Sequence, residues 1–207
     1  MGAAVRAGGT GNDTYIVDNA GDSLSESANQ GTDNVQSSVS FVLGLNVENL
    51  TLTGTAAING TGNGADNLVT GNSGNNVLGG GGGIDVLAGG AGADSFVFNL
   101  ADSAAQSARA TITDLNFAAG DSLTLNGFAP AITDIHSYLD LARLSGQGVT
   151  VAAGSQPGTE QFTLTGANSH TQVIVITDVS GNGTAVQQYQ AAVASLAAIG
   201  TGISTDS

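Results

Sequence analysis

Oxygen-bearing side chains recur at every ninth residue between residues 62 and 97. Four blocks follow one another without a gap: GNGADNLVT, GNSGNNVLG, GGGGIDVLA and GGAGADSFV. Their sixth residues are Asn67, Asn76, Asp85 and Asp94. Glycines nearby leave the backbone carbonyls free to point inward, and those of the last two blocks include Gly81, Gly83, Gly90 and Gly92. Carboxylate and carbonyl oxygens are the ligands that Ca²⁺ takes, about six to eight of them. The pattern therefore predicts calcium sites.

The same blocks predict the elements that would position these oxygens. In each block, six residues suit a turn, and the last three suit a short strand with an inward apolar residue at the eighth place. Those residues are Val69, Leu78, Leu87 and Phe96. Two blocks make one coil of about 18 residues, and coils must stack because none can bury its apolar residues alone.

Stacking places each block over the second block before it. This predicts two side-chain pairs, Asn67 with Asp85 and Asn76 with Asp94, with one ion in each cleft. A neutral amide offers an oxygen but attracts a cation less than a carboxylate does. We therefore expect weaker sites than in an array built only from aspartates.

Two other interpretations compete with calcium binding. A disordered linker would not place an apolar residue at the same place in four consecutive blocks, but a metal-free solenoid held by side-chain ladders stays open. A fifth copy, GGTGNDTYI, stands alone at residues 8–16. Asp13 is its candidate ligand, and the partner coil would have to be an irregular one.

The remaining sequence reads mainly as strands. Residues 17–61 alternate apolar and polar, which suits either irregular solenoid coils or strand pairs. Phe96 to Phe98 looks like a strand that closes the roll. Residues 110–128 read as strand, turn and strand, and the stretches 162–164 and 173–176 read as buried strands.

Two short helices are also predicted, over residues 133–144 with Thr133 as N-cap and over residues 185–199. We expect an all-β fold: a parallel β-roll followed by a β-rich cap that holds these helices. The expected division is 1–100 for the roll with its irregular spacer coils, and 101–207 for a capping and secretion-signal region.

Charge limits the possible partners. The chain has 17 acidic residues, three basic ones and a formal net charge of −14. Nucleic acid and anionic membrane surfaces would be repelled, whereas cations would be attracted. No apolar run approaches the ~20 residues that a transmembrane helix needs. Met1 to Gly9 shows no apolar segment typical of an N-terminal signal peptide.

Catalytic signatures are missing from the sequence. It has no His-Glu-x-x-His and no Gly-x-Ser-x-Gly, and its two histidines, His136 and His170, are far apart. Asp114 and Asp121 could imitate the carboxylate pair of a glycosidase, but nothing else supports that activity. We therefore expect a protein that is not an enzyme.

Three of the blocks carry the motif G-G-x-G-x-D-x-U-x, the calcium-binding nonapeptide of repeats-in-toxin proteins. They are GGTGNDTYI, GGGGIDVLA and GGAGADSFV. The segments 14–54 and 95–128 also resemble spacer and roll-ending segments of that family of secreted bacterial proteins. The resemblance covers residues 8–128 and implies Ca²⁺ as the ion. It further implies that Asp114 and Asp121 help to bind calcium or cap the roll.

The resemblance implies a function as well. Such proteins leave the bacterial cell through a type I secretion exporter, using an uncleaved C-terminal signal. We expect the C-terminal portion of a larger exoprotein, unfolded at low cytosolic calcium and folded by calcium outside the cell. The alternative is a surface-layer or adhesin segment that self-associates or assembles on the cell surface with calcium.

Overall fold

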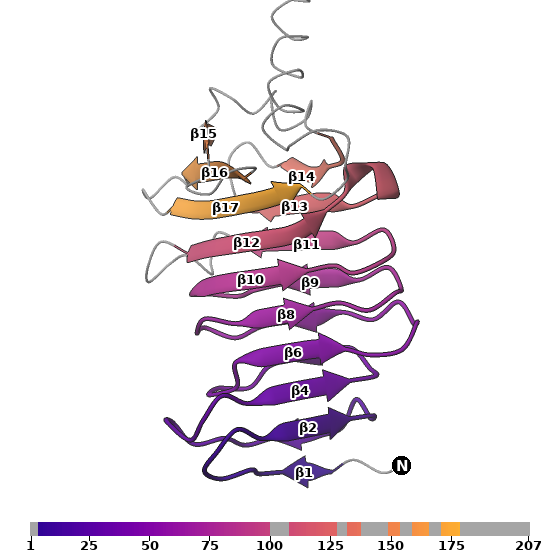
Figure 1. Ribbon diagram of the computed structural model, residues 1–207, viewed down its shortest axis with the longest axis vertical. Coiled ribbons are helices and arrows are strands. Elements are labelled where there is room, and N and C mark those ends of the chain that lie inside the picture. The colour runs from indigo at the N-terminus through magenta and orange to yellow at the C-terminus, as the bar shows by residue number, and fades with distance from the viewer. Residues whose placement is uncertain are drawn as a thin grey trace, which may run out of the picture.

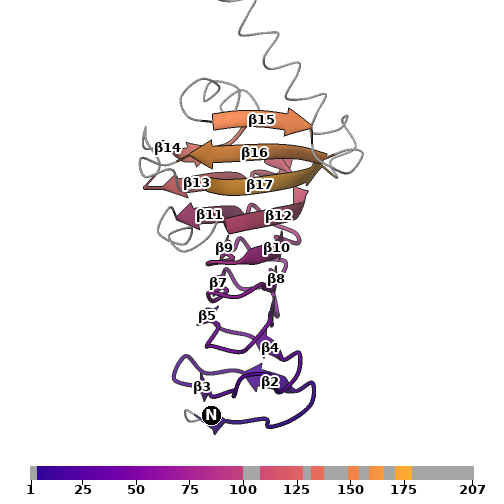
Figure 2. The same cartoon turned by 90° about the vertical axis from the view of Figure 1, so that its left-hand side faces the viewer.

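The protein is an elongated stack of short parallel strands in two facing sheets (Figure 1). The computed structural model describes residues 4–99, 108–127, 132–137, 149–153, 159–165 and 171–178. Turned by 90°, the structure shows the strands of the two sheets on opposite sides of a narrow interior, with a wider C-terminal end (Figure 2). The predicted parallel β-roll is confirmed.

From residue 34 to residue 126, each coil contributes one strand to each of the two large sheets. The first sheet contains, in spatial order from the N-terminal end, β2 (Thr14–Val17), β4 (Asn34–Ser37), β6 (Asn49–Leu52), β8 (Leu68–Thr70), β10 (Ile84–Ala88) and β12 (Ala108–Leu115). The second sheet contains β5 (Phe41–Val42), β7 (Gly60–Thr61), β9 (Val77–Gly79), β11 (Ser95–Asn99) and β13 (Ser122–Asn126). A separate pair, β1 (Val5–Arg6) and β3 (Ser23–Leu24), lies at the N-terminal end.

The core is a column of apolar residues between the sheets. The eighth residues of the four blocks are all fully buried, at 0% exposure: Val69, Leu78, Leu87 and Phe96. The strand register places the eighth residue of one block over the eighth residue of another: Val69 pairs with Leu87, and Leu78 pairs with Phe96. Each such side chain contributes roughly 1.5–3 kcal/mol when it is removed from water. The core therefore depends on neighbouring coils being in place together.

Residues 17–61 form irregular coils of the same roll. β4 pairs in parallel with both β2 and β6, which excludes local strand pairs for this segment. Corresponding positions are 20 residues apart between Asp13 and Asp33 and 15 apart between Asp33 and Glu48. In the regular blocks the spacing is 18, as between Asn67 and Asp85. The roll thus tolerates coils of different length while keeping its strands in register.

The roll continues beyond the nonapeptides. β13 pairs in parallel with β11, and β12 pairs in parallel with β10, so the expectation that residues 96–98 close the roll is wrong. The reason is that Leu123 and Leu125 extend the apolar column and give β11 a second neighbour. The predicted strand, turn and strand over 110–128 is confirmed as β12, the 3₁₀ turn η2 (Phe117–Ala119) and β13.

The helix expected over 133–144 is wrong where the structure describes it. Thr133 to Ile135 belong to β14 (Ile132–Ile135), which pairs antiparallel with β13. Ile135 is fully buried, so the edge of the second sheet offers both hydrogen bonds and burial that override the local helical pattern. Residues 138–144 and the helix expected over 185–199 lie outside the described residues.

Three more strands extend the first sheet. β17 (Thr171–Asp178) pairs in parallel with β12, and β16 (Thr159–Thr165) pairs antiparallel with β17. β15 (Val149–Ala153) pairs antiparallel with β16. The strands expected at 162–164 and 173–176 are confirmed. The division of the chain at residue 100 stays a prediction.

Candidate metal sites between the stacked turns

The four regular turns have two different backbone conformations. In the aspartate turns, the second and fourth residues all have positive φ: Gly81 at 87°, Gly83 at 102°, Gly90 at 90° and Gly92 at 121°. The lone copy repeats this at Gly9 and Gly11, with 103° and 114°. None of the corresponding residues of the asparagine turns, Asn63, Ala65, Asn72 and Gly74, has a positive φ. Glycine is needed at these places in the aspartate turns because other residues rarely adopt that conformation.

Close stacking is the second reason for glycine. The N–H of Gly82 donates to the carbonyl of Asn63 at 2.9 Å, and the N–H of Ala91 donates to that of Asn72 at 3.2 Å. A Cβ placed on Gly81 would collide with the carbonyl oxygen of Asn63, and one on Gly90 with that of Asn72. The turns are therefore in direct backbone contact, and their carbonyl oxygens lie at the boundary between coils.

Both predicted pairs are brought together. The N–H of Asn67 donates to Oδ1 of Asp85 at 3.0 Å, and the N–H of Asn76 donates to Oδ1 of Asp94 at 2.8 Å. All four residues are buried. In each pair the hydrogen bond runs from a backbone N–H to a carboxylate, so each aspartate is held against the turn that precedes it in the stack.

The side chain of Asn67 folds back onto its own turn. Its Oδ1 accepts the N–H of Asn63 at 2.6 Å, and its Nδ2 donates to the carbonyls of Val47 and Glu48 at 3.1 and 3.2 Å. Asn63 adds two bonds, from its Nδ2 to the carbonyls of Gly44 and Val47. These amide groups connect carbonyls of neighbouring coils, which is the task that a cation would otherwise perform.

Asn76 repeats this arrangement on the other edge. Its Oδ1 accepts the N–H of Asn72 at 2.8 Å, and its Nδ2 donates to the carbonyl of Ile58 at 2.7 Å. The amides of both asparagines are thus engaged within the protein. Their role as calcium ligands stays a prediction, and the aspartate oxygens are the stronger candidates.

Asp94 has the clearest unmet requirement for a partner. It is 1% exposed, its Oδ1 is used by Asn76, and its Oδ2 is buried without a hydrogen-bond donor. The pKa of Asp94 is raised to about 6, mainly by burial; the N–H of Asn76 lowers it, and the charges of Asp121 and Asp114 add to the increase. A buried anionic oxygen without a donor is costly unless a cation compensates it.

Asp114 and Asp121 border the same turn from the C-terminal side. Asp114 accepts the N–H groups of Gly89 and Gly90 at 2.8 and 2.9 Å. Asp121 accepts the N–H of Asp94 at 2.9 Å and that of Asn116 at 2.8 Å. Burial raises the pKa of Asp121, opposed by those N–H groups and assisted by Asp114. Both carboxylates thus bind backbone donors of turns that would otherwise lack partners, and both add negative charge near Asp94.

The column of carboxylates also runs through the irregular coils. In this part of the chain, the sequence alone predicts only Asp13 as a ligand. The N–H of Asp13 donates to Oδ1 of Asp33 at 2.8 Å, and the N–H of Asp33 donates to Oε2 of Glu48 at 2.7 Å. The signal is an acidic residue two places before a buried apolar one, as in Asp33-Asn-Val35 and Glu48-Asn-Leu50. It is half of the nonapeptide motif, without its glycines.

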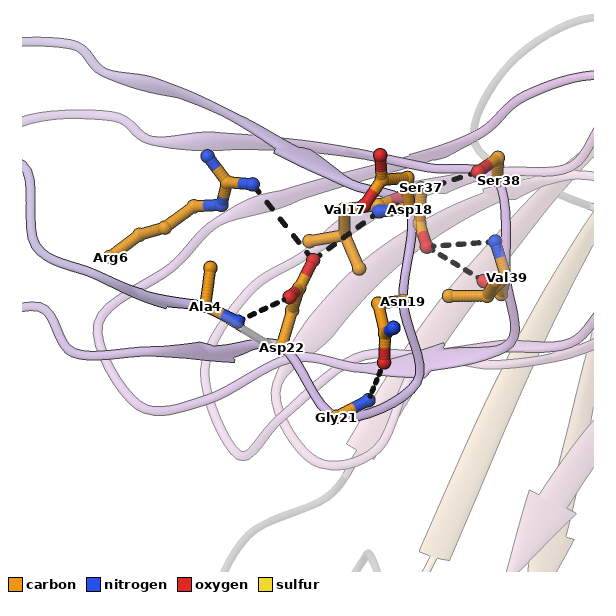
Figure 3. Close-up of polar contacts among 10 residues, drawn as sticks. All are labelled: Ala4, Arg6, Val17, Asp18, Asn19, Gly21, Asp22, Ser37, Ser38 and Val39. Carbon is orange, nitrogen blue, oxygen red and sulfur yellow. Dashed lines mark hydrogen bonds and ion pairs between the residues drawn. The ribbon is translucent and has the colours of Figure 1, made fainter. Parts of the chain in front are cut away.

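Asp22 occupies the equivalent place on the other edge, before β3 (Figure 3). Its Oδ1 accepts the N–H of Ala4 at 2.7 Å, and its Oδ2 lies 3.4 Å from the N–H of Asp18 and 3.9 Å from the guanidinium of Arg6. The N–H of Ala4 lowers the pKa of Asp22 most, and Asp18 and Arg6 lower it as well, against the effect of burial. Here protein donors and a guanidinium compensate the charge, in contrast to Asp94.

Parallel coils joined by acidic, glycine-rich turns define the class of calcium-binding nonapeptide rolls. The family model described as Peptidase M10 serralysin C terminal matches residues 4–193. The chain therefore belongs to this family, the non-catalytic C-terminal repeat region of a peptidase family, and the repeats-in-toxin resemblance is confirmed. A search among curated proteins found no match. Among the described residues, no helix is long and apolar enough to cross a membrane.

Proposed function

We propose that this chain binds Ca²⁺ between its stacked turns, folds as the ions bind outside the cell, and supports type I secretion of a larger exoprotein. The observation that carries the proposal is the buried Oδ2 of Asp94, which has no donor although Asp114 and Asp121 add charge beside it. Ca²⁺ supplies the missing positive charge, and the backbone carbonyl oxygens of the glycine-rich turns can serve as its further ligands.

The ligand set follows from the same geometry. Asp85 and Asp94 supply carboxylates between regular turns, and Asp13 supplies one in the lone copy. Carbonyl oxygens of the turns containing Gly81, Gly83, Gly90 and Gly92 complete the sites. Asp114 and Asp121 add charge at the last turn and hold its N–H groups, while Asn67 and Asn76 contribute an amide oxygen at most.

Charge repulsion connects calcium to folding. The chain carries a formal charge of −14, and the roll places carboxylates of successive coils in columns along its edges. Without cations this arrangement opposes compaction, and with them the binding free energy becomes folding free energy. The chain would thus pass an exporter unfolded and acquire its roll at extracellular calcium levels.

A calcium titration followed by circular dichroism tests the proposal. We expect little β signal in chelator and a cooperative gain of β signal as Ca²⁺ is added, with Mg²⁺ as the control ion. Equal β content in chelator and in calcium would refute calcium-driven folding. Fusion of residues 130–207 to a passenger, with export assayed in cells that carry or lack the exporter, tests the secretion signal separately.

Calcium-dependent assembly is the second candidate. Three apolar side chains lie exposed on the neighbouring strands β8 and β10 of the first sheet, Leu68 at 44%, Ile84 at 58% and Val86 at 37%, and Leu68 is the register partner of Val86. Such a patch favours contact with another surface. Light scattering during the calcium titration separates the two functions, because large oligomers favour a surface-layer or adhesin role and a monomer favours the secretion module.

A further inference from the structure

Three carboxylates converge where the lone nonapeptide turn meets the first irregular coil. Asp13, Glu26 and Asp33 each offer an oxygen, and these oxygens all lie within 4.8 Å of one another. Asp33 is buried, and the other two are partly buried. One ion with bonds of about 2.4 Å can contact oxygens up to about 4.8 Å apart, so the cluster has the size that a single Ca²⁺ requires.

Hydrogen bonds hold the carboxylates of the cluster in place, but two of their oxygens have no hydrogen-bond partner. Glu26 accepts the N–H of Gly8 through Oε1 at 3.0 Å, and Asp33 accepts the N–H of Asp13 through Oδ1 at 2.8 Å. Oδ2 of Asp13 and Oε2 of Glu26 are buried and have no hydrogen-bond partner. Two unpartnered carboxylate oxygens beside a third carboxylate repel one another, and a cation bound between them would relieve this repulsion.

Tyr15 provides an independent indication of a ligand. It is 5% exposed, and its hydroxyl is buried without a partner, although buried tyrosine hydroxyls normally have one. A Cβ on Gly8 would collide with both this hydroxyl and Oδ2 of Asp13, so the two atoms face the same small space beside the Gly8 backbone. The phenol can offer its oxygen to an ion, or donate to a water that the ion holds.

Glu26 distinguishes this place from the clefts of the regular array. It lies 18 residues after Gly8 and stands over the first glycine of its block. In the regular stack that place holds another glycine, since Gly80 lies over Gly62 and Gly89 over Gly71. Arg6, the only basic residue in the sequence before Arg109, is directed at Asp22 (Figure 3). Within the described part of the chain, the three carboxylates of the cluster therefore form no ion pair.

We propose that Asp13, Glu26 and Asp33, with Tyr15 beside them, form a further Ca²⁺ site that joins the lone nonapeptide to the irregular coil. It contains three formal negative charges, whereas the cleft between Asn67 and Asp85 has one at its sixth positions. Affinity in oxygen sites rises with the number of charged ligands, so this site fills at lower calcium than the asparagine-containing clefts. It fixes the N-terminal coils, where the regular repeat is interrupted.

Terbium(III), used as a luminescent stand-in for Ca²⁺, tests the site on the full chain. The chain has three tyrosines and no tryptophan, and the other two tyrosines, Tyr138 and Tyr189, lie outside the described residues. Excitation of tyrosine should give terbium emission that saturates early in the titration. Tyr15→Phe should remove most of this early emission while leaving the number of bound calcium ions, measured by calorimetry, unchanged.

Glu26→Gln tests the ligand itself, because glutamine keeps an oxygen that can accept the N–H of Gly8. We expect the tightest calcium-binding step to weaken by about tenfold or more, because one of three charged ligands is lost. Asp18→Asn is the matched control. It removes one charge from an exposed residue of the same region and should change neither the tightest calcium-binding step nor the early terbium emission.

The outcomes separate this site from the proposed function. Unchanged affinity in Glu26→Gln, or early emission as bright in Tyr15→Phe as in the parent, overturns the site even if the chain still folds on calcium. Absence of any calcium binding by the parent chain refutes the proposed function as well. Circular dichroism in saturating calcium checks that each variant folds, and Tyr15→Phe decides the matter if Glu26→Gln does not.

Discussion

The backbone N–H of Asp94 donates a 2.9 Å hydrogen bond to Oδ1 of Asp121, 27 residues further along the chain. Through this bond, the column that begins at Asn76 and Asp94 continues past the last nonapeptide into the coil that follows. Both carboxylates are buried, and both have a raised pKa. Among the regular turns, the last one is therefore where uncompensated negative charge is concentrated, and calcium bound there should stabilise the roll.

Replacing Asp94 by asparagine should stabilise the calcium-free protein, although it removes a proposed calcium ligand. Without calcium, we expect the Asp94→Asn variant to be more stable than the parent, because a buried charge beside Asp114 and Asp121 disappears. With calcium, it should gain less stability than the parent does. Urea denaturation in chelator and in calcium measures both effects.

Asp66→Asn is the control for that variant. Asp66 is exposed, and its Oδ1 accepts the N–H of Ile84 at 2.8 Å, a bond that the asparagine oxygen can keep. It removes the same formal charge without touching a buried cleft. If both substitutions change the calcium-free stability equally, net charge alone is responsible and the special role of Asp94 is lost.

Calcium-free stability should fall as pH rises from about 4 to about 6. The pKa of Asp94 is raised to about 6 in the folded chain, from an ordinary value of 3.8, so the folded state binds the proton more tightly than the unfolded state in this window. Asp121, whose pKa is also raised, adds an effect of the same sign. Well above pH 6, Asp94 is ionised in both the folded and the unfolded state, and its contribution to stability no longer changes with pH.

Asp22 has the opposite dependence. Its pKa is lowered, so its contribution is present above 3.8 and is lost as pH falls further through the folded value. The calcium-free chain should therefore be most stable near pH 4. Urea denaturation in chelator across pH 3 to 8 measures the profile, and Asp94→Asn should flatten its upper part. Stability that rises between pH 4 and 6 would contradict this assignment.

The regular part of the fold could be predicted because one short motif specifies it. A nine-residue period with an apolar eighth place determines both the strand and its stacking partner, so Val69 over Leu87 follows from spacing alone. The pairing of Asn76 with Asp94 follows for the same reason. The irregular coils lack this period, and so Asp33, Glu48 and Glu26 could not be assigned to a column before the register of their strands was known.

Backbone conformation and competition between secondary-structure elements explain where else the structure differs from what the sequence predicts. Asn67 fits the repeat by position, yet its turn lacks the positive φ of the aspartate turns and its amide bonds to Asn63, Val47 and Glu48. Spacing does not encode that choice. Ile135 fits a helical pattern, but the open edge of β13 offers it a complete burial that local preference cannot outweigh.

Replacing Asn76 by aspartate should make the roll more dependent on calcium. The change removes the Nδ2 donor to the Ile58 carbonyl, at 2.7 Å, and places a second carboxylate next to Asp94. In chelator we expect a loss of about 1–3 kcal/mol in the free energy of unfolding, because a buried hydrogen-bond donor is lost. Calcium should bind more tightly than in the parent, which calorimetry can measure.

Asn75→Asp is the control within the same turn. Asn75 is exposed, and its Oδ1 accepts the N–H of Ala93 at 3.0 Å, which an aspartate oxygen can also do. The control adds the same charge and keeps this hydrogen bond. Asn76→Asp with parent-like stability in chelator would show that the asparagine amide does not hold the coils together.

Replacing Gly81 by alanine should damage the roll far more than replacing Gly64. Gly81 has φ 87°, and a Cβ there would collide with the carbonyl oxygen of Asn63 in the turn below. The left-handed conformation alone costs roughly 1–2 kcal/mol for alanine, and the collision adds to it by forcing two stacked turns apart. A Cβ on Gly64 would meet nothing within 4 Å, and its φ is not positive. Thermal unfolding in saturating calcium should therefore separate the two variants clearly, with Gly64→Ala close to the parent and Gly81→Ala far less stable. Equal stability of the two would mean that the turns are not in the close contact on which the calcium sites depend.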